Sequence, residues 1–144
     1  PEMYIPRIDN YVLQLDIYRT NVNGIVGYDC VGNPTATNRF YDDNAWMASA
    51  LLDIYAVTGN SQHLSRAIDA YNFALSGEDT SFGGGIKWKE TQYDGDPAVM
   101  KGISSTAGAC YAAIKLYEIT NEAKYLEDSQ RLMTWMLNTL QDED

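Results

Sequence analysis

Two segments of the chain are apolar on nearly every side at helical spacing. Between residues 45 and 57 only Ser49 and Asp53 are polar, and the segment 107–119 carries only two charged side chains. A helix that is apolar all round belongs in a protein interior or in a membrane, and segments of this length are too short to span a bilayer. The pattern therefore predicts inner helices of a folded domain, the first at about 42–58.

Three further segments are apolar on one face only, at 7–19, 61–76 and 122–140. In the first of them, apolar side chains recur at Ile8 and then three, four and seven residues later, while acidic and amide side chains take the other side. This spacing predicts amphipathic helices. The connections at 20–40 and 77–103, rich in Asn, Gly, Thr and Asp, are predicted to be long loops.

The helical pattern repeats along the chain. Residues 54–59 align with residues 116–121 at an offset of 62 (116 − 54), and Leu64 meets Leu126 at the same offset. A fixed period of this length indicates stacked helical hairpins, with an inner ring of wholly apolar helices inside an outer ring. A ring closed by six such hairpins needs roughly 350 residues. We therefore expect an all-α chain that forms a single partial domain over residues 1–144, about two and a half hairpins.

Loop lengths locate a candidate site. The connections from inner to outer helices are short, whereas those from outer to inner helices are long, so all the long loops emerge where the inner helices begin. Loops of twenty or more residues inside a compact domain are usually functional. Asp42 and Asp43 lie at that end, at the start of the first inner helix.

Charge and composition narrow the possible partners. The formal net charge is −10, which repels phosphate backbones and makes nucleic acid an improbable partner. Cys30 and Cys110 allow at most one disulfide and lack metal-ligand spacing, so neither a metal nor a cofactor is expected. No signal-like or membrane-spanning segment is found, and the opening Pro1 suggests a piece of a longer chain.

Adjacent carboxylates are the sharpest chemical signal. Acids at a helix start often serve only as caps that suit the helix dipole. Neighbouring helical residues, however, have Cβ atoms roughly 5–6 Å apart, close to the separation of the carboxyl pair in retaining glycosidases. Two carboxylates that close cannot both ionise freely, so one is raised in pKa and can act as an acid. The pair Asp42–Asp43 therefore fits either capping or glycoside chemistry.

Aromatic side chains gather near the same end. Aromatic faces with polar neighbours suit sugar rings, and four aromatics fall in the long loops or beside the acids: Tyr41, Trp46, Trp88 and Tyr93. The aromatics at helical spacing, such as Trp135, are expected in the core. The lone His63 is expected to be exposed, and the glycine run 83–85 is expected to let backbone pass close to a ligand or another loop.

The segment from Tyr41 to Leu52, which reads YDDNAWMASALL, resembles the signature of glycoside hydrolase family 76, the α-1,6-mannanases. A second block, GGGIKWK at 83–89, and a third at 101–109 are similar to further blocks of that family. The resemblance covers about 38–140. It implies an (α/α)6 barrel and hydrolysis with retention of configuration. By position, Asp42 would be the nucleophile and Asp43 the general acid/base.

The resemblance also places Trp46 and Trp88 near substrate, and we add Tyr41, Lys89 and Tyr93 as candidate substrate contacts. The function expected is endo-acting cleavage of α-1,6-mannosidic linkages in a mannan backbone, by a protein that is secreted, on the cell surface or periplasmic. Three alternatives remain open: a mannan-binding toroid without catalysis, a cell-wall mannan transglycosylase, and a helical scaffold in which the acids only cap.

Overall fold

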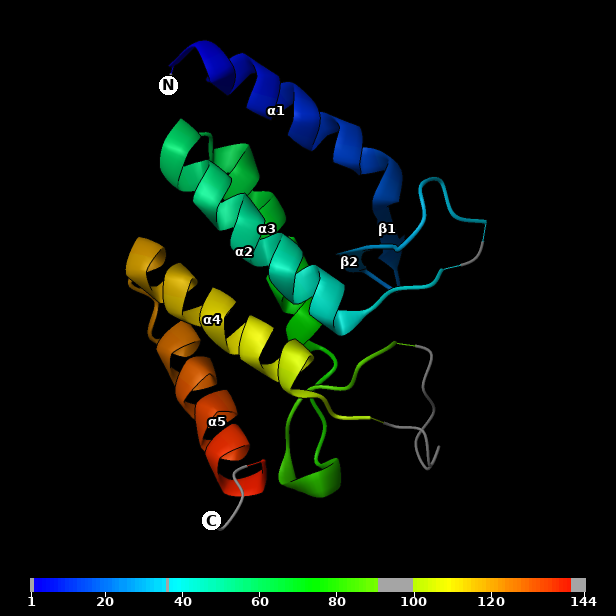
Figure 1. The fold of residues 1–144 in the computed structure, drawn as a ribbon, viewed down its shortest axis with the longest axis vertical. Helices are drawn as coiled ribbons and strands as arrows, with labels where there is room; N and C mark the ends of the chain where they lie inside the picture. Colours follow the sequence, from blue (N-terminus) through cyan, green and yellow to red (C-terminus); the bar gives the residue numbers. More distant parts are fainter. Residues whose placement is uncertain (1, 36, 91–99, 141–144) are drawn as a thin grey trace.

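The computed structural model describes residues 2–35, 37–90 and 100–140, and five α-helices dominate it (Figure 1). Each predicted helix is present, with boundaries shifted by a few residues. The α-helices are α1 (Ile5–Gln14), α2 (Tyr41–Thr58), α3 (Ser61–Leu75), α4 (Ile103–Thr120) and α5 (Ala123–Thr139). Short 3₁₀ turns are η1 (Glu2–Tyr4), η2 (Leu15–Tyr18) and η3 (Ser81–Gly83).

The helices pack as hairpins placed side by side. Helix α2 packs against α3, α4 packs against α5, and the two hairpins meet through α2 and α4 (Figure 1). The core between them is built from small and branched side chains, including Ala48, Leu51 and Leu116, all fully buried. The inner helices nevertheless keep one face open, where Trp46 and Tyr111 are exposed. The arrangement is that of part of a ring.

The 62-residue period is visible in matching details of the two hairpins. Thr58 and Thr120 each donate a hydroxyl hydrogen bond to the carbonyl four residues back, at 2.8 Å in both cases. The residues that follow, Gly59 and Asn121, both adopt the left-handed conformation that ends a helix. Lys115 on α4 pairs with the residue 62 positions earlier on α2. Residue i of α2 thus lies beside residue i + 62 of α4.

Both long connections reach the ends at which α2 and α4 begin, and the short turns lie at the opposite end (Figure 1). The predicted placement of the long loops is therefore confirmed. Within the described residues no helix is long and apolar enough to cross a bilayer.

The prediction of a loop throughout 20–40 is wrong in its first part. Strands β1 (Arg19–Val22) and β2 (Ile25–Tyr28) form an antiparallel hairpin in which Val22 pairs with Ile25. The turn is Asn23-Gly24, and both residues have positive φ, 52° and 85°. This dipeptide favours the tight turn whose twist matches the paired strands.

The prediction that His63 is exposed is also wrong. Its ring is 3% exposed, and Nε2 lies 2.6 Å from the carboxylate of Asp9 on α1. The contact joins α1 to the start of α3. Because this acid lies 54 residues away in the chain, the local sequence around His63 gives no sign of the burial.

The second long connection is organised around Lys101. Its ammonium donates to the carbonyls of Asp79, Gly84 and Gly85 and pairs with the Asp79 carboxylate. A Cβ placed on Gly85 would lie 2.6 Å from the ring of Trp135. The glycine run therefore lets the backbone pass close to another element, the buried indole on α5.

Candidate active site

Helix α2 begins with the two acids in its first turn. The N-cap position belongs to Phe40, which makes no side-chain capping bond, so neither acid is the N-cap of the helix. The backbone N–H of Tyr41 donates to the carbonyl of Trp88 at 2.9 Å, which attaches the helix start to the second long connection. Asp42 is half-buried and Asp43 is exposed at this end of the inner helix.

The two carboxyl groups have unequal surroundings. Oδ1 of Asp42 accepts from the backbone N–H of Asp43 at 3.0 Å, and Oδ2 accepts from the hydroxyl of Ser104 at 3.4 Å. Partial desolvation raises the pKa of Asp43, and the neighbouring charge of Asp42 raises it further. Within the described residues, the Asp43 carboxylate accepts no hydrogen bond. The two carboxyl groups are therefore not equivalent: Asp42 is held by two hydrogen bonds, whereas Asp43 has a raised pKa and no such bond within the described residues.

Asp43 lines a cavity of about 500 Å³ between the start of α2 and the segment around η2 and β2. The lining is mostly apolar and includes two aromatic rings from the hairpin side and an indole from α2. The lining residues are Leu15, Tyr18, Tyr28, Asp29, Cys30, Asp43, Trp46, Met47 and Ala50. We call this space the Asp43 groove. It places an acid beside a surface suited to the apolar face of a sugar.

Asn44 attaches one wall of the groove to helix α2. Its side chain is fully buried, and Oδ1 accepts from the N–H of Tyr28 at 2.6 Å. Nδ2 donates to the carbonyl of Tyr28 at 2.9 Å and to that of Phe40 at 2.8 Å. Three hydrogen bonds therefore hold the end of β2 against the first turn of α2.

Arg39 performs a similar function on the other side of the helix start. It is fully buried, makes a bidentate pair with Glu90 and donates to the carbonyl of Ile25 at 2.9 Å. Its guanidinium lies 4.4 Å from the centroid of the Phe73 ring. One side chain thus joins the hairpin, α3 and the segment that carries Trp88.

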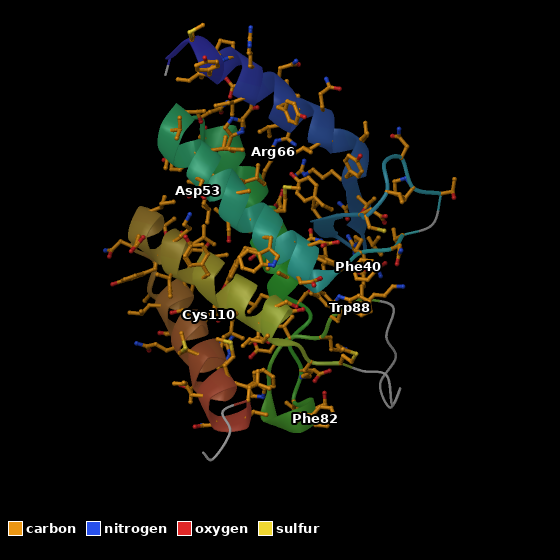
Figure 2. The ribbon with its side chains drawn as sticks, in the orientation of Figure 1. Phe40, Asp53, Arg66, Phe82, Trp88 and Cys110 are labelled. Carbon is orange, nitrogen blue, oxygen red and sulfur yellow. The ribbon has the colours of Figure 1, made fainter. Side chains whose placement is uncertain are left out.

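Trp88 lies beside this helix start, where its ring packs on Phe40 with centroids 5.0 Å apart (Figure 2). The ammonium of Lys89 also lies over the Phe40 ring, 5.3 Å from its centroid. Both side chains therefore lie beside the residue that precedes α2, but neither lines the Asp43 groove.

Of the predicted substrate contacts, only Trp46 lines the same groove as Asp43. Tyr41 does not fit the expectation that it contacts substrate. Its ring is 5% exposed, stacked on Phe73 and pressed against Gly77, so its role in this chain is in the core. Tyr93 lies outside the described residues.

The described part of the chain contains two free thiols. Cys30 is exposed and lines the Asp43 groove, and Cys110 is buried. No group of three or more His, Cys, Asp or Glu side chains that could hold a metal ion occurs among the described residues.

A family model described as glycosyl hydrolase family 76 matches residues 14–144. The chain belongs to this family. A family 76 α-mannanase from Bacteroides thetaiotaomicron is 35% identical, with a TM-score of 0.91 over 99% of this chain and 40% of that one. A comparison with curated proteins gave no match.

Two other solved family 76 structures show the same fold. One, from a bovine Bacteroides thetaiotaomicron strain, is 29% identical with a TM-score of 0.88, over 99% of this chain and 29% of that one. The other is an inactive α-1,6-mannanase variant from Salegentibacter sp. HEL1_6 in complex with α-1,6-mannotriose. It is 29% identical with a TM-score of 0.65, over 72% of this chain and 29% of its own.

The chain thus spans between 29% and 40% of the length of these family 76 structures. Its two and a half hairpins are a part of the family's α/α barrel, as the repeat predicts. Three residues that hold the start of α2 or contact Asp42 are not predicted from the sequence: Asn44, Arg39 and Ser104. Only the 62-residue repeat could have found one of them, because it places Ser104 opposite Asp42 (104 − 42 = 62).

Proposed function

We propose that the protein is a retaining glycoside hydrolase that cleaves α-1,6-mannosidic linkages in mannan, with Asp42 as nucleophile and Asp43 as general acid/base. Membership of family 76 supports the hydrolase class. The Salegentibacter relative supports the linkage and the acid pair, since it is named an α-1,6-mannanase and its inactive variant carries two consecutive aspartates replaced by asparagine.

The unequal surroundings of the two acids carry the proposal. A retaining mechanism needs one carboxylate that is charged and held in place, and one carboxyl group that keeps its proton until the leaving group needs it. Asp42 accepts two hydrogen bonds, one on each carboxylate oxygen, which hold the side chain in place. Asp43 has a raised pKa caused first by desolvation and then by its neighbour's charge. Each acid therefore has the environment that its proposed role requires.

The reaction proceeds in two displacements. In the first, a carboxylate oxygen of Asp42 bonds to the anomeric carbon while the glycosidic C–O bond breaks, and Asp43 gives its proton to the departing oxygen. In the second, Asp43 takes a proton from water, the water oxygen attacks the anomeric carbon, and the ester to Asp42 breaks. Two inversions restore the original configuration, with both acids returned to their starting states.

The Asp43 groove is the proposed place for one sugar of the chain. The indole of Trp46 is half-exposed in it and offers a face to the C–H side of a pyranose ring. A polymer of this kind does not cross a membrane intact, so we extend the proposal to a protein that acts outside the cytoplasm.

Separate replacement of the acids in the full-length protein tests this assignment. With α-1,6-mannotetraose as substrate, Asp42→Asn and Asp43→Asn are each expected to lower kcat by roughly 10³-fold or more, while binding measured by calorimetry stays within a few-fold. Azide is expected to restore turnover of Asp43→Ala and give α-mannosyl azide, because it attacks the glycosyl ester without needing a base.

Asp53→Asn is the matched control, since Asp53 lies on the same helix but pairs with Lys115 instead of belonging to the acid pair. It is expected to keep the parent's kcat. NMR of the first-formed product is expected to show the α-anomer. A β-anomer, or full activity in either acid variant, would contradict the mechanism. Binding without turnover in the parent protein would favour the mannan-binding alternative.

A further inference from the structure

Ser104 occupies the position on α4 that corresponds to Asp42 on α2. The two helices begin 62 residues apart, at Tyr41 and Ile103 (103 − 41), and the hydroxyl of Ser104 lies 3.4 Å from Oδ2 of Asp42. The same offset pairs Lys115 with Asp53 further along the two helices. The contact at the helix starts is therefore part of the regular register between α2 and α4.

Ser104 is the only side chain among the described residues that donates to the Asp42 carboxylate. The other donor, the N–H of Asp43, holds Oδ1. With one oxygen held by its own helix and the other by the neighbouring helix, rotation of the carboxylate is restricted.

Other charged groups around the helix start are engaged elsewhere. Four charged groups on the described part of the connection before α4 and on α4 itself pair with other residues: Lys101 and Lys87 with Asp79, Glu90 with Arg39, and Lys115 with Asp53. Lys89 lies over the Phe40 ring and Asp43 adjoins Asp42 on α2. Ser104 is thus the group on α4 that acts directly on Asp42.

We propose that Ser104 is a positioning residue of this enzyme, whose hydroxyl orients the Asp42 carboxylate for attack on the sugar. The inference rests on the proposed function. Under this proposal the two hairpins act together: α2 supplies both acids, and Ser104 of α4 orients one of them.

The test compares Ser104→Ala, Ser104→Thr and Ser105→Ala in the full-length protein on α-1,6-mannotetraose. Ser105 is the matched control, because its hydroxyl is buried next in sequence and has no hydrogen-bond partner in the described part of the chain. Ser104→Ala is expected to lower kcat about tenfold with KM changed less than twofold.

Ser104→Thr keeps the hydroxyl and is expected to recover most of the loss, and Ser105→Ala is expected to match the parent. Ser104 is exposed, so the Tm of both Ser104 variants should stay within a few degrees of the parent's. Parent-like kcat in Ser104→Ala, or no recovery with threonine, would overturn the proposal.

A readout without turnover separates this inference from the proposed function. Crystal structures of the parent and of Ser104→Ala are expected to show the Asp42 carboxylate turned to a different orientation in the variant. If the parent does not cut mannan, the proposed function fails, and this comparison still decides whether Ser104 positions Asp42. An unchanged Asp42 side chain overturns the inference in either case.

Discussion

Replacing Asn44 with alanine removes the attachment between the hairpin and the helix that carries both acids. The fully buried amide makes three hydrogen bonds, two with the backbone of Tyr28 and one with the carbonyl of Phe40. A buried backbone group that loses its partner bears the full desolvation cost. The alanine side chain offers neither a donor nor an acceptor in return.

The magnitude follows from these bonds. At about 1 kcal/mol net for each, Asn44→Ala is expected to lower the free energy of unfolding by about 3 kcal/mol. Asn44→Asp keeps one acceptor for the N–H of Tyr28 but turns both donations into contacts between a carboxylate and carbonyl oxygens. It also adds a third acid next to Asp42 and Asp43. We therefore expect it to be at least as destabilising as the alanine.

Urea unfolding followed by circular dichroism, with linear extrapolation, measures the change. The control is Asn72→Ala, the same substitution at an exposed position of α3, where a change within about 0.5 kcal/mol is expected. If Asn44→Ala costs no more than Asn72→Ala, the side chain does not hold the hairpin and the reasoning is refuted.

Three further changes test other contacts. Gly85→Ala should lower the free energy of unfolding in urea by about 3 kcal/mol, because φ is +76° and the new Cβ would lie 2.6 Å from the Trp135 ring. Gly59→Ala is the control: φ is +67° but the space around it is open, so a loss of about 1 kcal/mol is expected. Arg39→Met should lower the free energy of unfolding by about 3 kcal/mol, because it leaves the Glu90 carboxylate without its partner. Adding Glu90→Gln should recover much of this loss. A loss smaller than that of Gly59→Ala would contradict the structural role of Arg39. Burial would raise the pKa of Asp79, but two lysines and a serine hold that pKa well below its ordinary value. The contribution of Asp79 to the free energy of unfolding is therefore complete above about pH 4 and is lost as the pH falls further. The stability gap between the parent and Asp79→Asn should therefore shrink from pH 6 to pH 2, and a gap independent of pH would show the pairing to be unimportant.

The helices and their order were predictable because hydrophobic spacing is a local property of the chain. The end of α2 at Gly59 and that of α4 at Asn121 follow from residues that tolerate a left-handed conformation. The repeat also predicted which inner helices would be neighbours. The hairpin at 19–28 had a signal in Asn23-Gly24 that was read only as part of a loop.

The rest of the site depends on partners that are distant in the chain. Arg39 meets Glu90 at a separation of 51 residues, and no local pattern marks either as buried or paired. The burial of Tyr41 depends on Phe73 and Gly77 of another helix and its end. The acid pair itself was found because its two members are adjacent, but the difference between their surroundings required the fold.

The two acids, although neighbours, depend on contacts of very different range. Asp43 faces a wall tied to α2 by Asn44 and Tyr28, only 16 residues apart. Asp42 accepts a hydrogen bond from Ser104 on α4, 62 residues later in the chain. A change that loosens the second hairpin should therefore displace Asp42, the proposed nucleophile, before it displaces Asp43. Mutations far from either carboxylate can thus disturb one proposed role and leave the surroundings of the other intact.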